Sequence, residues 1–198
     1  MSRNQKVYLF FKRLLDVIFS FISIIAFLPF MILISIIIKL TSNGPILFIQ
    51  MRIGKDKKPF KIIKFRTMQN GAPEIPSNSL SPEEIRKLST KFGVFLRKTS
   101  LDESPQIFNI LLGQMSFVGP RPGALKNEEY LVYERDKYQP SPFSLKPGLT
   151  GYAQTHGRRN DSPTKARLDH YYVSNVSFFL DIKIIILTIG KLFRFEGS

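Results

Sequence analysis

The sequence predicts an α+β chain that is mainly helical, with an N-terminal re-entrant membrane helix-break-helix, a small β-hairpin and a compact cytoplasmic domain with interfacial amphipathic helices. Three observations support this fold class: a long apolar run near the N-terminus, two short strand-like segments around a basic turn, and helix patterns over much of the remaining chain. We divide the chain into a membrane hairpin over residues 1–40 and a cytosolic domain over residues 41–198.

The apolar run extends from Val17 to Ile38 without a charged residue, which is about the length that a helix needs to cross a bilayer. Pro29 lies inside this run, where it removes a backbone hydrogen bond and bends or breaks a helix. A secretory signal peptide would be shorter and would end at a small-residue cleavage site. Basic residues flank both ends, whereas a spanning helix has its excess on the cytoplasmic side only. We therefore favour a re-entrant hairpin that turns at Pro29 over a single span, with anionic membrane lipids binding the flanking cations.

Two short segments after the apolar run have the composition of strands. Residues 46–51 and 60–65 are apolar and flank the turn Gly-Lys-Asp-Lys-Lys at 54–58, which predicts a β-hairpin with a basic tip. Residues 71–82 are rich in proline, serine and asparagine, which is typical of a surface loop.

Helix signals dominate the rest of the chain. Ser81 is a candidate N-cap followed by a proline and two acids, so a helix is predicted to begin there and to continue towards Gly93. Further helices are predicted over residues 106–112, 125–138, 164–173 and 176–194, and an irregular glycine-rich segment over 146–160. Charges interrupt the apolar helix at 176–194, so we expect it to pack in the core or to lie in the membrane interface.

The charge balance restricts the partners. Lys and Arg number 29 against 15 Asp and Glu, which gives a net charge of +14 and predicts anionic partners: nucleic acid, acidic lipids or phosphorylated small molecules. The chain has no cysteine, which excludes disulfides and thiolate metal sites.

Two adjacent carboxylates, Asp102 and Glu103, interrupt this basic chain. One interpretation is local, because Ser100 and Glu103 have the spacing of a capping box. The other places both acids just outside a helix that Ser104 caps and Pro105 opens, where free N–H groups favour an anion. A carboxylate at such a position can attack phosphorus to form an acyl-phosphate, or it can bind Mg²⁺ together with substrate phosphates.

Arginines near glycines and prolines form the second candidate feature. In FVGPRPG, two prolines and two glycines fix the backbone around Arg121, which suits forked binding of a phosphate, although an ordinary turn with a solvated side chain has the same composition. Arg158 and Arg159 follow a glycine-rich stretch whose N–H groups can approach an anion closely. No Walker A or GxGxxG pattern is present.

Several motifs in order resemble the bacterial sugar transferases, and in particular the small monotopic phosphoglycosyl transferases, over nearly the whole chain. These motifs are KRLLDVIFS with its apolar run and proline, FKIIKFRTM, LRKTSLDESPQIFNILLGQMSFVGPRP, KPGLTGYAQTHGR and YYVSNVSFFLDIKII. The chain departs from the family pattern at two positions: Leu28 replaces the usual serine before Pro29 at the hairpin break, and Ser104 replaces a leucine.

The resemblance implies roles for individual residues. Asp102 would be the nucleophile that forms a covalent phosphosugar intermediate, and also a ligand of Mg²⁺, the implied cofactor. Glu103 would help to activate a lipid phosphate acceptor. Arg97, Arg121 and Arg158 match the phosphate-binding positions of the family.

The implied reaction is the transfer of a sugar-1-phosphate from a UDP-sugar donor to polyprenyl (undecaprenyl) phosphate, with release of UMP by a ping-pong mechanism. It would be the first membrane step of glycoconjugate assembly, at the cytoplasmic face of the bacterial inner membrane. The alternatives are a membrane-tethered nucleic-acid-binding protein and a non-catalytic scaffold. We expect no nucleic-acid partner, because no element interleaves basic and aromatic residues on one face and the acid pair would repel a phosphate backbone. The sequence leaves the oligomeric state open.

Overall fold

The computed structural model describes residues 1–72, 81–125, 128–157 and 161–193. Within these residues helices predominate and the strands form two two-stranded sheets, which confirms the predicted α+β, mainly helical class. The longer elements are α1 (Arg3–Thr41), β1 (Leu47–Ile53), β2 (Pro59–Phe65), α7 (Ser162–Ser174) and α8 (Phe178–Phe193). The shorter ones are η1 (Lys55–Lys57), α2 (Pro82–Leu88), α3 (Lys91–Thr99), η3 (Leu101–Glu103), α4 (Gln106–Leu111), β3 (Ser116–Val118), α5 (Glu129–Asp136), η4 (Pro142–Ser144), β4 (Gly148–Thr150) and α6 (Tyr152–His156).

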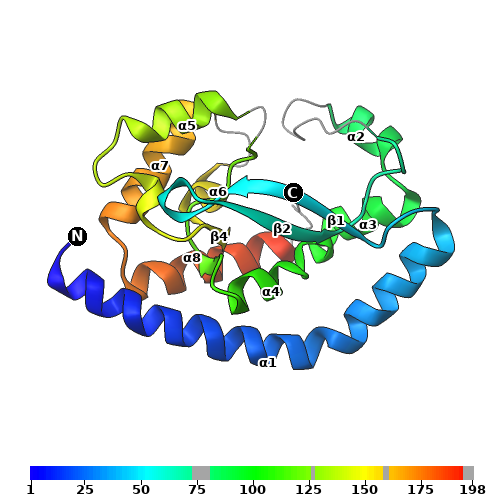
Figure 1. Ribbon diagram of the computed structural model, residues 1–198, viewed down its shortest axis with the longest axis horizontal. Coiled ribbons are helices and arrows are strands. Elements are labelled where there is room, and N and C mark those ends of the chain that lie inside the picture. Colours follow the sequence, from blue (N-terminus) through cyan, green and yellow to red (C-terminus); the bar gives the residue numbers. More distant parts are fainter. Residues whose placement is uncertain (73–80, 126–127, 158–160, 194–198) are drawn as a thin grey trace.

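The N-terminal helix α1 runs without interruption through Pro29, so the expected helix-break-helix does not occur as two separate helices. Figure 1 shows instead that α1 bends in its C-terminal half, the half that contains Pro29. A proline inside a helix loses one N–H donor and crowds the preceding turn, which bends a helix whose other hydrogen bonds persist. Among the described residues, α1 is the one helix long and apolar enough to cross a membrane. The re-entrant path through a membrane stays a prediction.

The inner face of α1 is polar in its first half and apolar in its second half. Lys12 forms a buried ion pair with Asp181 of α8, and Asp16 Oδ1 accepts hydrogen bonds from Ser116 Oγ (3.1 Å) and Phe117 N (3.2 Å). The second half contributes to an apolar cluster that consists of Met31, Ile34, Ile38, Phe65, Leu96 and Ile107. Both halves of α1 are therefore attached to the rest of the molecule.

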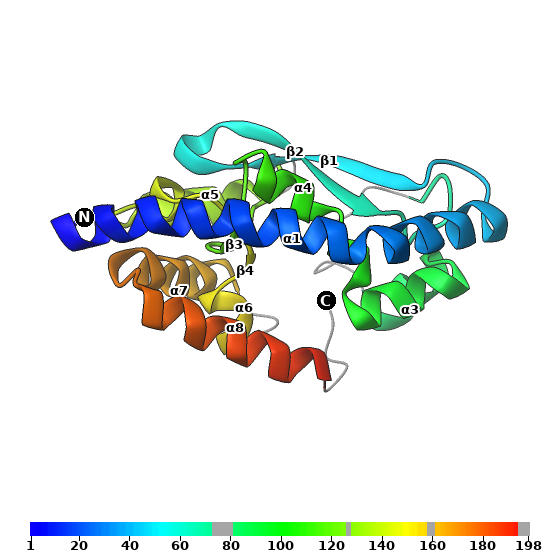
Figure 2. The same ribbon diagram turned by 90° about the horizontal axis from the view of Figure 1, so that it is seen from below.

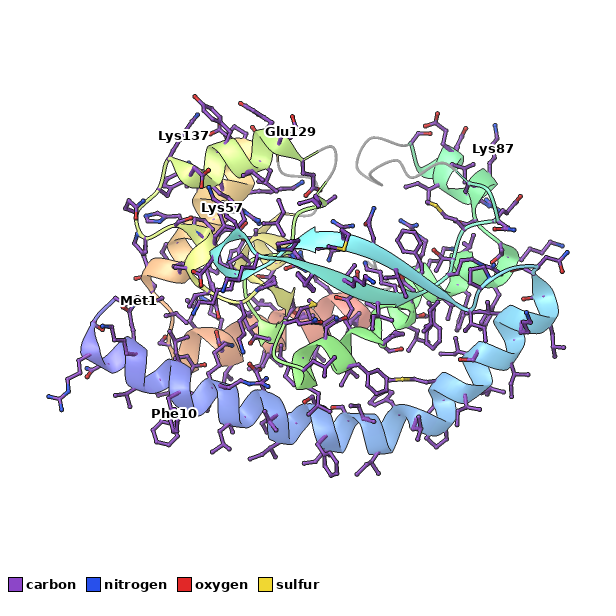
Figure 3. The ribbon with its side chains drawn as sticks, in the orientation of Figure 1. Met1, Phe10, Lys57, Lys87, Glu129 and Lys137 are labelled. Atoms are coloured by element: carbon purple, nitrogen blue, oxygen red, sulfur yellow. The ribbon has the colours of Figure 1, made fainter. Side chains whose placement is uncertain are left out.

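The outer faces of α1 and α8 are apolar and exposed. Phe10 is 72% exposed and points away from the rest of the molecule in Figure 3, and Phe179 of α8 is 83% exposed. Figure 2 shows α1 and α8 running across the same side of the molecule. Exposed apolar surface of this extent indicates a membrane or protein contact.

The two sheets differ in how well local patterns predict them. β1 and β2 pair antiparallel from Leu47↔Phe65 to Ile53↔Pro59, which confirms the predicted β-hairpin. β3 pairs in parallel with β4, with Val118 opposite Thr150. β4 falls in the segment expected to be irregular, over 146–160, and neither strand was predicted, because three-residue strands carry too little periodicity to be recognised.

The helix predicted from Ser81 towards Gly93 is wrong in extent, because α2 and α3 are separate helices that meet at Thr90. Thr90 N donates to Thr67 O (2.9 Å), and the Thr90 side chain accepts from Gly93 N (2.9 Å), which caps a new helix. The helix predicted over 125–138 is shortened to α5, whereas α4, α7 and α8 occur within a few residues of their predicted bounds. Of the predicted loop at 71–82, residues 73–80 lie outside the described residues.

Candidate active site

Asp102 and Glu103 lie on the 3₁₀ turn η3, between α3 and α4. Ser100 has a left-handed backbone (φ 56°) and its side chain caps nothing, so the capping-box interpretation is wrong. The expected cap at Ser104 is wrong as well, because its hydroxyl donates back to Leu101 O (2.8 Å) and α4 begins without a side-chain cap. The two acids still lie directly before α4, as the second interpretation required.

Glu103 is buried and paired with two cations. Lys64 Nζ of β2 lies 2.6 Å from Glu103 Oε1, and Arg121 Nη2 lies 3.0 Å from the same oxygen. Burial by itself would raise the pKa of Glu103, but Lys64 and Arg121 outweigh it and hold that pKa well below its usual range. Glu103 is therefore a permanent anion that holds two cations in place.

Asp102 is equally buried, at 6% exposed, but its environment differs. Its Oδ1 atom has no hydrogen-bond partner among the described residues. Burial, reinforced by the charge of Glu103, raises the pKa of Asp102 to about 6 against the opposing charges of Lys64, Arg97 and Arg121. Two neighbouring carboxylates thus have opposite properties: one is neutralised by cations and the other has an uncommitted oxygen.

Hydrogen bonds from several elements hold the turn that carries Arg121. Four successive carbonyls accept hydrogen bonds from different elements: Pro120 O from Gly148 N (2.9 Å), Arg121 O from Arg135 Nη2 (2.9 Å), Pro122 O from Arg52 Nη1 (3.2 Å) and Gly123 O from Ile53 N (3.0 Å). Such a turn presents the Arg121 guanidinium to Glu103 at a low entropic cost.

A cleft of about 2150 Å³ opens over these residues. One part of its lining is charged and contains Asp102, Glu103, Lys64, Arg97 and Arg121. Another part is apolar and comes from α8, with Ile185, Ile189 and Leu192, and from Phe27 of α1. The cleft therefore joins a phosphate-binding type of surface to an apolar surface near the long helix α1.

In a comparison with known protein families, the model described as "Bacterial sugar transferase" matches residues 7–195. The chain belongs to the bacterial sugar transferase family. A relative named "Exopolysaccharide production protein PSS" from Rhizobium leguminosarum bv. phaseoli is 36% identical over 94% of this chain and 97% of its own length.

Two longer relatives of this chain carry names that state a reaction. A "UDP-glucose:undecaprenyl-phosphate glucose-1-phosphate transferase" from Klebsiella pneumoniae is 42% identical over 92% of this chain. A "UDP-N-acetylgalactosamine-undecaprenyl-phosphate N-acetylgalactosaminephosphotransferase" from Aeromonas hydrophila is 36% identical over 97% of this chain. The chain spans 40% of the length of the Klebsiella protein and 46% of the Aeromonas protein.

The structure adds site residues that the sequence reasoning missed. Lys64 is one of them, and the strand pattern could have identified it. It shares the inward face of β2 with the buried Phe60 and Ile62, where a charged side chain needs a partner of opposite charge. Gln106 is another, because it lines a small pocket together with Lys64, Glu103 and Arg121, and its buried Nε2 atom has no hydrogen-bond partner among the described residues. Nothing in its local sequence distinguishes Gln106 from an ordinary helix residue.

The remaining predicted site residues have different positions. Arg97, in the last turn of α3, lines the cleft and lowers the pKa of Asp102. Arg158 lies outside the described residues, and Pro29 lies on α1 away from the cleft lining. Across the described part of the chain, no three His, Cys, Asp or Glu side chains gather closely enough to hold a metal ion.

Proposed function

We propose that this sugar transferase moves a sugar-1-phosphate from a UDP-sugar to polyprenyl (undecaprenyl) phosphate, by a ping-pong mechanism with a covalent intermediate on Asp102. The observation that supports the proposal is the difference between the environments of the two acids. Glu103 pairs with Lys64 and Arg121, whereas Asp102 keeps an oxygen without a hydrogen-bond partner among the described residues. The names of the Klebsiella and Aeromonas relatives support the donor and acceptor classes.

In the first half-reaction a carboxylate oxygen of Asp102 attacks the phosphorus that bears the sugar. An acyl-phosphate bond forms, the bond from this phosphorus to the bridging oxygen breaks, and UMP leaves with the electron pair. In the second half-reaction an oxygen of the lipid phosphate attacks the same phosphorus, and the acyl-phosphate bond breaks to regenerate the carboxylate. Arg121 and Arg97 border the cleft beside Asp102, where their charges would stabilise the phosphoryl oxygens in both steps.

Glu103 has a supporting role in this proposal. The family resemblance implies that it helps to activate the acceptor phosphate, which would require it to take a proton. Its lowered pKa makes it a weak base, and its contacts with Lys64 and Arg121 favour a role in placing these cations.

Mg²⁺ is the proposed cofactor, and Asp102 is the residue that would hold it. A hard carboxylate oxygen suits Mg²⁺, which typically binds one or two carboxylates together with substrate phosphates. When bound, the ion would neutralise charge on the donor diphosphate. Because no third ligand side chain is close within the described residues, we expect weak Mg²⁺ binding to the free protein and at least tenfold tighter binding in the presence of UDP, measured by titration calorimetry. Equal Mg²⁺ affinity with and without UDP would contradict this assignment.

The covalent step is tested by intact-mass measurement after incubation with UDP-sugar and Mg²⁺ but without acceptor. The wild type should gain the mass of one phosphosugar and release one UMP per chain. Asp102→Asn should gain nothing, whereas Asp136→Asn, which makes the same chemical change at an exposed carboxylate, should react like the wild type. An unmodified wild type across a panel of UDP-sugars, or an adduct on Asp102→Asn, would refute the proposal.

We further propose that the sugar transferase sits on the cytoplasmic face of the bacterial inner membrane as a monotopic protein, with α1 re-entrant and anionic lipids at its basic flanks. The exposed apolar faces of α1 and α8 support a membrane contact. Since the chain has no cysteine, single cysteines at Ser2→Cys and Asn43→Cys can report on topology. In inside-out vesicles a membrane-impermeant maleimide should label both positions. Labelling of only one of them would establish a spanning helix.

A further inference from the structure

A buried arginine on α5 lies behind the Arg121 turn. Arg135 is 3% exposed, and its guanidinium has three neighbours. Its Nε and Nη2 atoms donate to Asp169 Oδ2 of α7 (3.1 and 2.5 Å), its Nη2 atom also donates to Arg121 O (2.9 Å), and the ring of Phe143 lies 5.4 Å from its Cζ atom. The guanidinium is therefore fixed from several directions.

The pair formed by Arg135 and Asp169 is not explained by stability alone. Burying two charges costs solvation free energy that their attraction often fails to recover, so well-packed apolar residues would serve an ordinary core as well. Asp169 is 1% exposed, and its Oδ1 atom has no hydrogen-bond partner among the described residues, so the pair is also incompletely satisfied. The contact that apolar residues could not reproduce is the hydrogen bond to Arg121 O.

This hydrogen bond connects the pair to the candidate active site in two steps. Arg121 receives it on its backbone carbonyl, and the side chain of the same residue contacts Glu103, which also binds Lys64. Of the four hydrogen bonds that hold the turn, those from Gly148 and Ile53 come from backbone N–H groups. Arg135 supplies the side-chain donor at Arg121 itself.

We propose that Arg135, oriented by Asp169, is a positioning residue that fixes the backbone of Arg121 so that the Arg121 guanidinium meets the transferring phosphate beside Asp102. The inference rests on the proposed function for the identity of that phosphate. Arg135 itself has almost no exposed surface, so it acts through Arg121 and not by touching the substrate. A displacement of about 1 Å at a phosphate-binding group can cost on the order of a hundredfold in rate.

Arg135→Lys is the most informative variant, because it keeps a cation beside Asp169 but lacks the forked donors needed to reach Arg121 O as well. Val173→Ala serves as the control, since it removes apolar volume from α7 at a fully buried position, in a cluster that contains no residue of the turn at 119–124. Both variants are compared with the wild type well below their melting temperatures. If Arg135→Lys fails to fold, the neutral double variant Arg135→Gln/Asp169→Asn replaces it.

Two readouts are measured: hydrogen–deuterium exchange of the turn amides over residues 119–124, and UMP release kinetics. For Arg135→Lys we expect at least tenfold faster exchange in the turn and a tenfold or greater fall in kcat, with the donor KM changed less than threefold. Val173→Ala should show neither change. If the turn amides of Arg135→Lys exchange at the wild-type rate, or if this variant keeps the wild-type kcat, the positioning role is overturned. If the wild type releases no UMP with any donor, the proposed function fails, and the exchange comparison still decides whether Arg135 holds the turn.

Discussion

The pH dependence of the first half-reaction provides the sharpest test of how the two acids share the site. Asp102 must be ionised to attack phosphorus, and burial with the charge of Glu103 raises its pKa to about 6. Rate should therefore be lost as the pH falls through this value. For a single group with this pKa, the ionised fraction falls about tenfold between pH 7.5 and pH 5.

The fall in rate at low pH is the acid limb of the pH–rate profile. Two substitutions should move this acid limb in opposite directions. Lys64→Met removes the cation that lowers the pKa of Asp102 most, so the limb should move to higher pH by about one unit or more. Glu103→Gln removes a neighbouring negative charge and frees Lys64 and Arg121, so the limb should move to lower pH by about one unit or more. Lys61→Met, at an exposed position on the same strand, should leave the limb unchanged.

The assay is single-turnover formation of the Asp102 adduct between pH 4.5 and pH 8.5, without acceptor. The acceptor is omitted because a phosphate monoester has a second pKa near 6 and would produce an acid limb of its own. Because Mg²⁺ bound at Asp102 would lower its pKa, all variants are measured at one Mg²⁺ concentration and the directions of the two shifts are compared. The reasoning is refuted if Lys64→Met and Glu103→Gln shift the limb in the same direction, or if either leaves it unchanged.

Three further predictions concern stability. Asp102→Asn should abolish turnover yet raise the free energy of unfolding at pH 7.5 by about 1–3 kcal/mol. The reason is that a carboxylate whose pKa is raised to about 6 in the folded state destabilises that state above this pH. Urea unfolding should show the gain in stability shrinking as the pH falls towards 4. Gly93→Ala should lower the free energy of unfolding by about 2 kcal/mol or more, since the new Cβ would lie 2.0 Å from Thr67 O. Gly190→Ala is the control: its Cβ would have nothing within 4 Å, so the same urea unfolding should show a neutral or slightly stabilising effect. Lys12→Met should lower the free energy of unfolding by about 3 kcal/mol, because it leaves Asp181 buried without its cation. A loss of stability below about 1 kcal/mol would show that the ion pair contributes little to attaching α1.

Local sequence determined the elements whose signals lie within a few residues of one another. The β1–β2 hairpin follows from two apolar segments around a basic turn, and the helix over 106–111 follows from apolar spacing that ends at Gly113. These predictions succeeded because turn chemistry and helix periodicity act between neighbours in the chain. The same local reasoning failed at Thr90, where the hydrogen bond to Thr67 O divides one expected helix into two.

Tertiary structure alone decided which residues meet at the site. The sequence indicated an acid pair and a rigid Arg121 turn, but Lys64 contacts Glu103 from 39 positions away, and Arg135 donates to Arg121 O from α5, which packs against α7. The contrast between Asp102 and Glu103 is also non-local, since identical solvation would give adjacent carboxylates similar pKa values. Both carboxylates are buried, and their pKa values differ because Lys64 and Arg121 contact Glu103 directly, which depends on how distant segments pack.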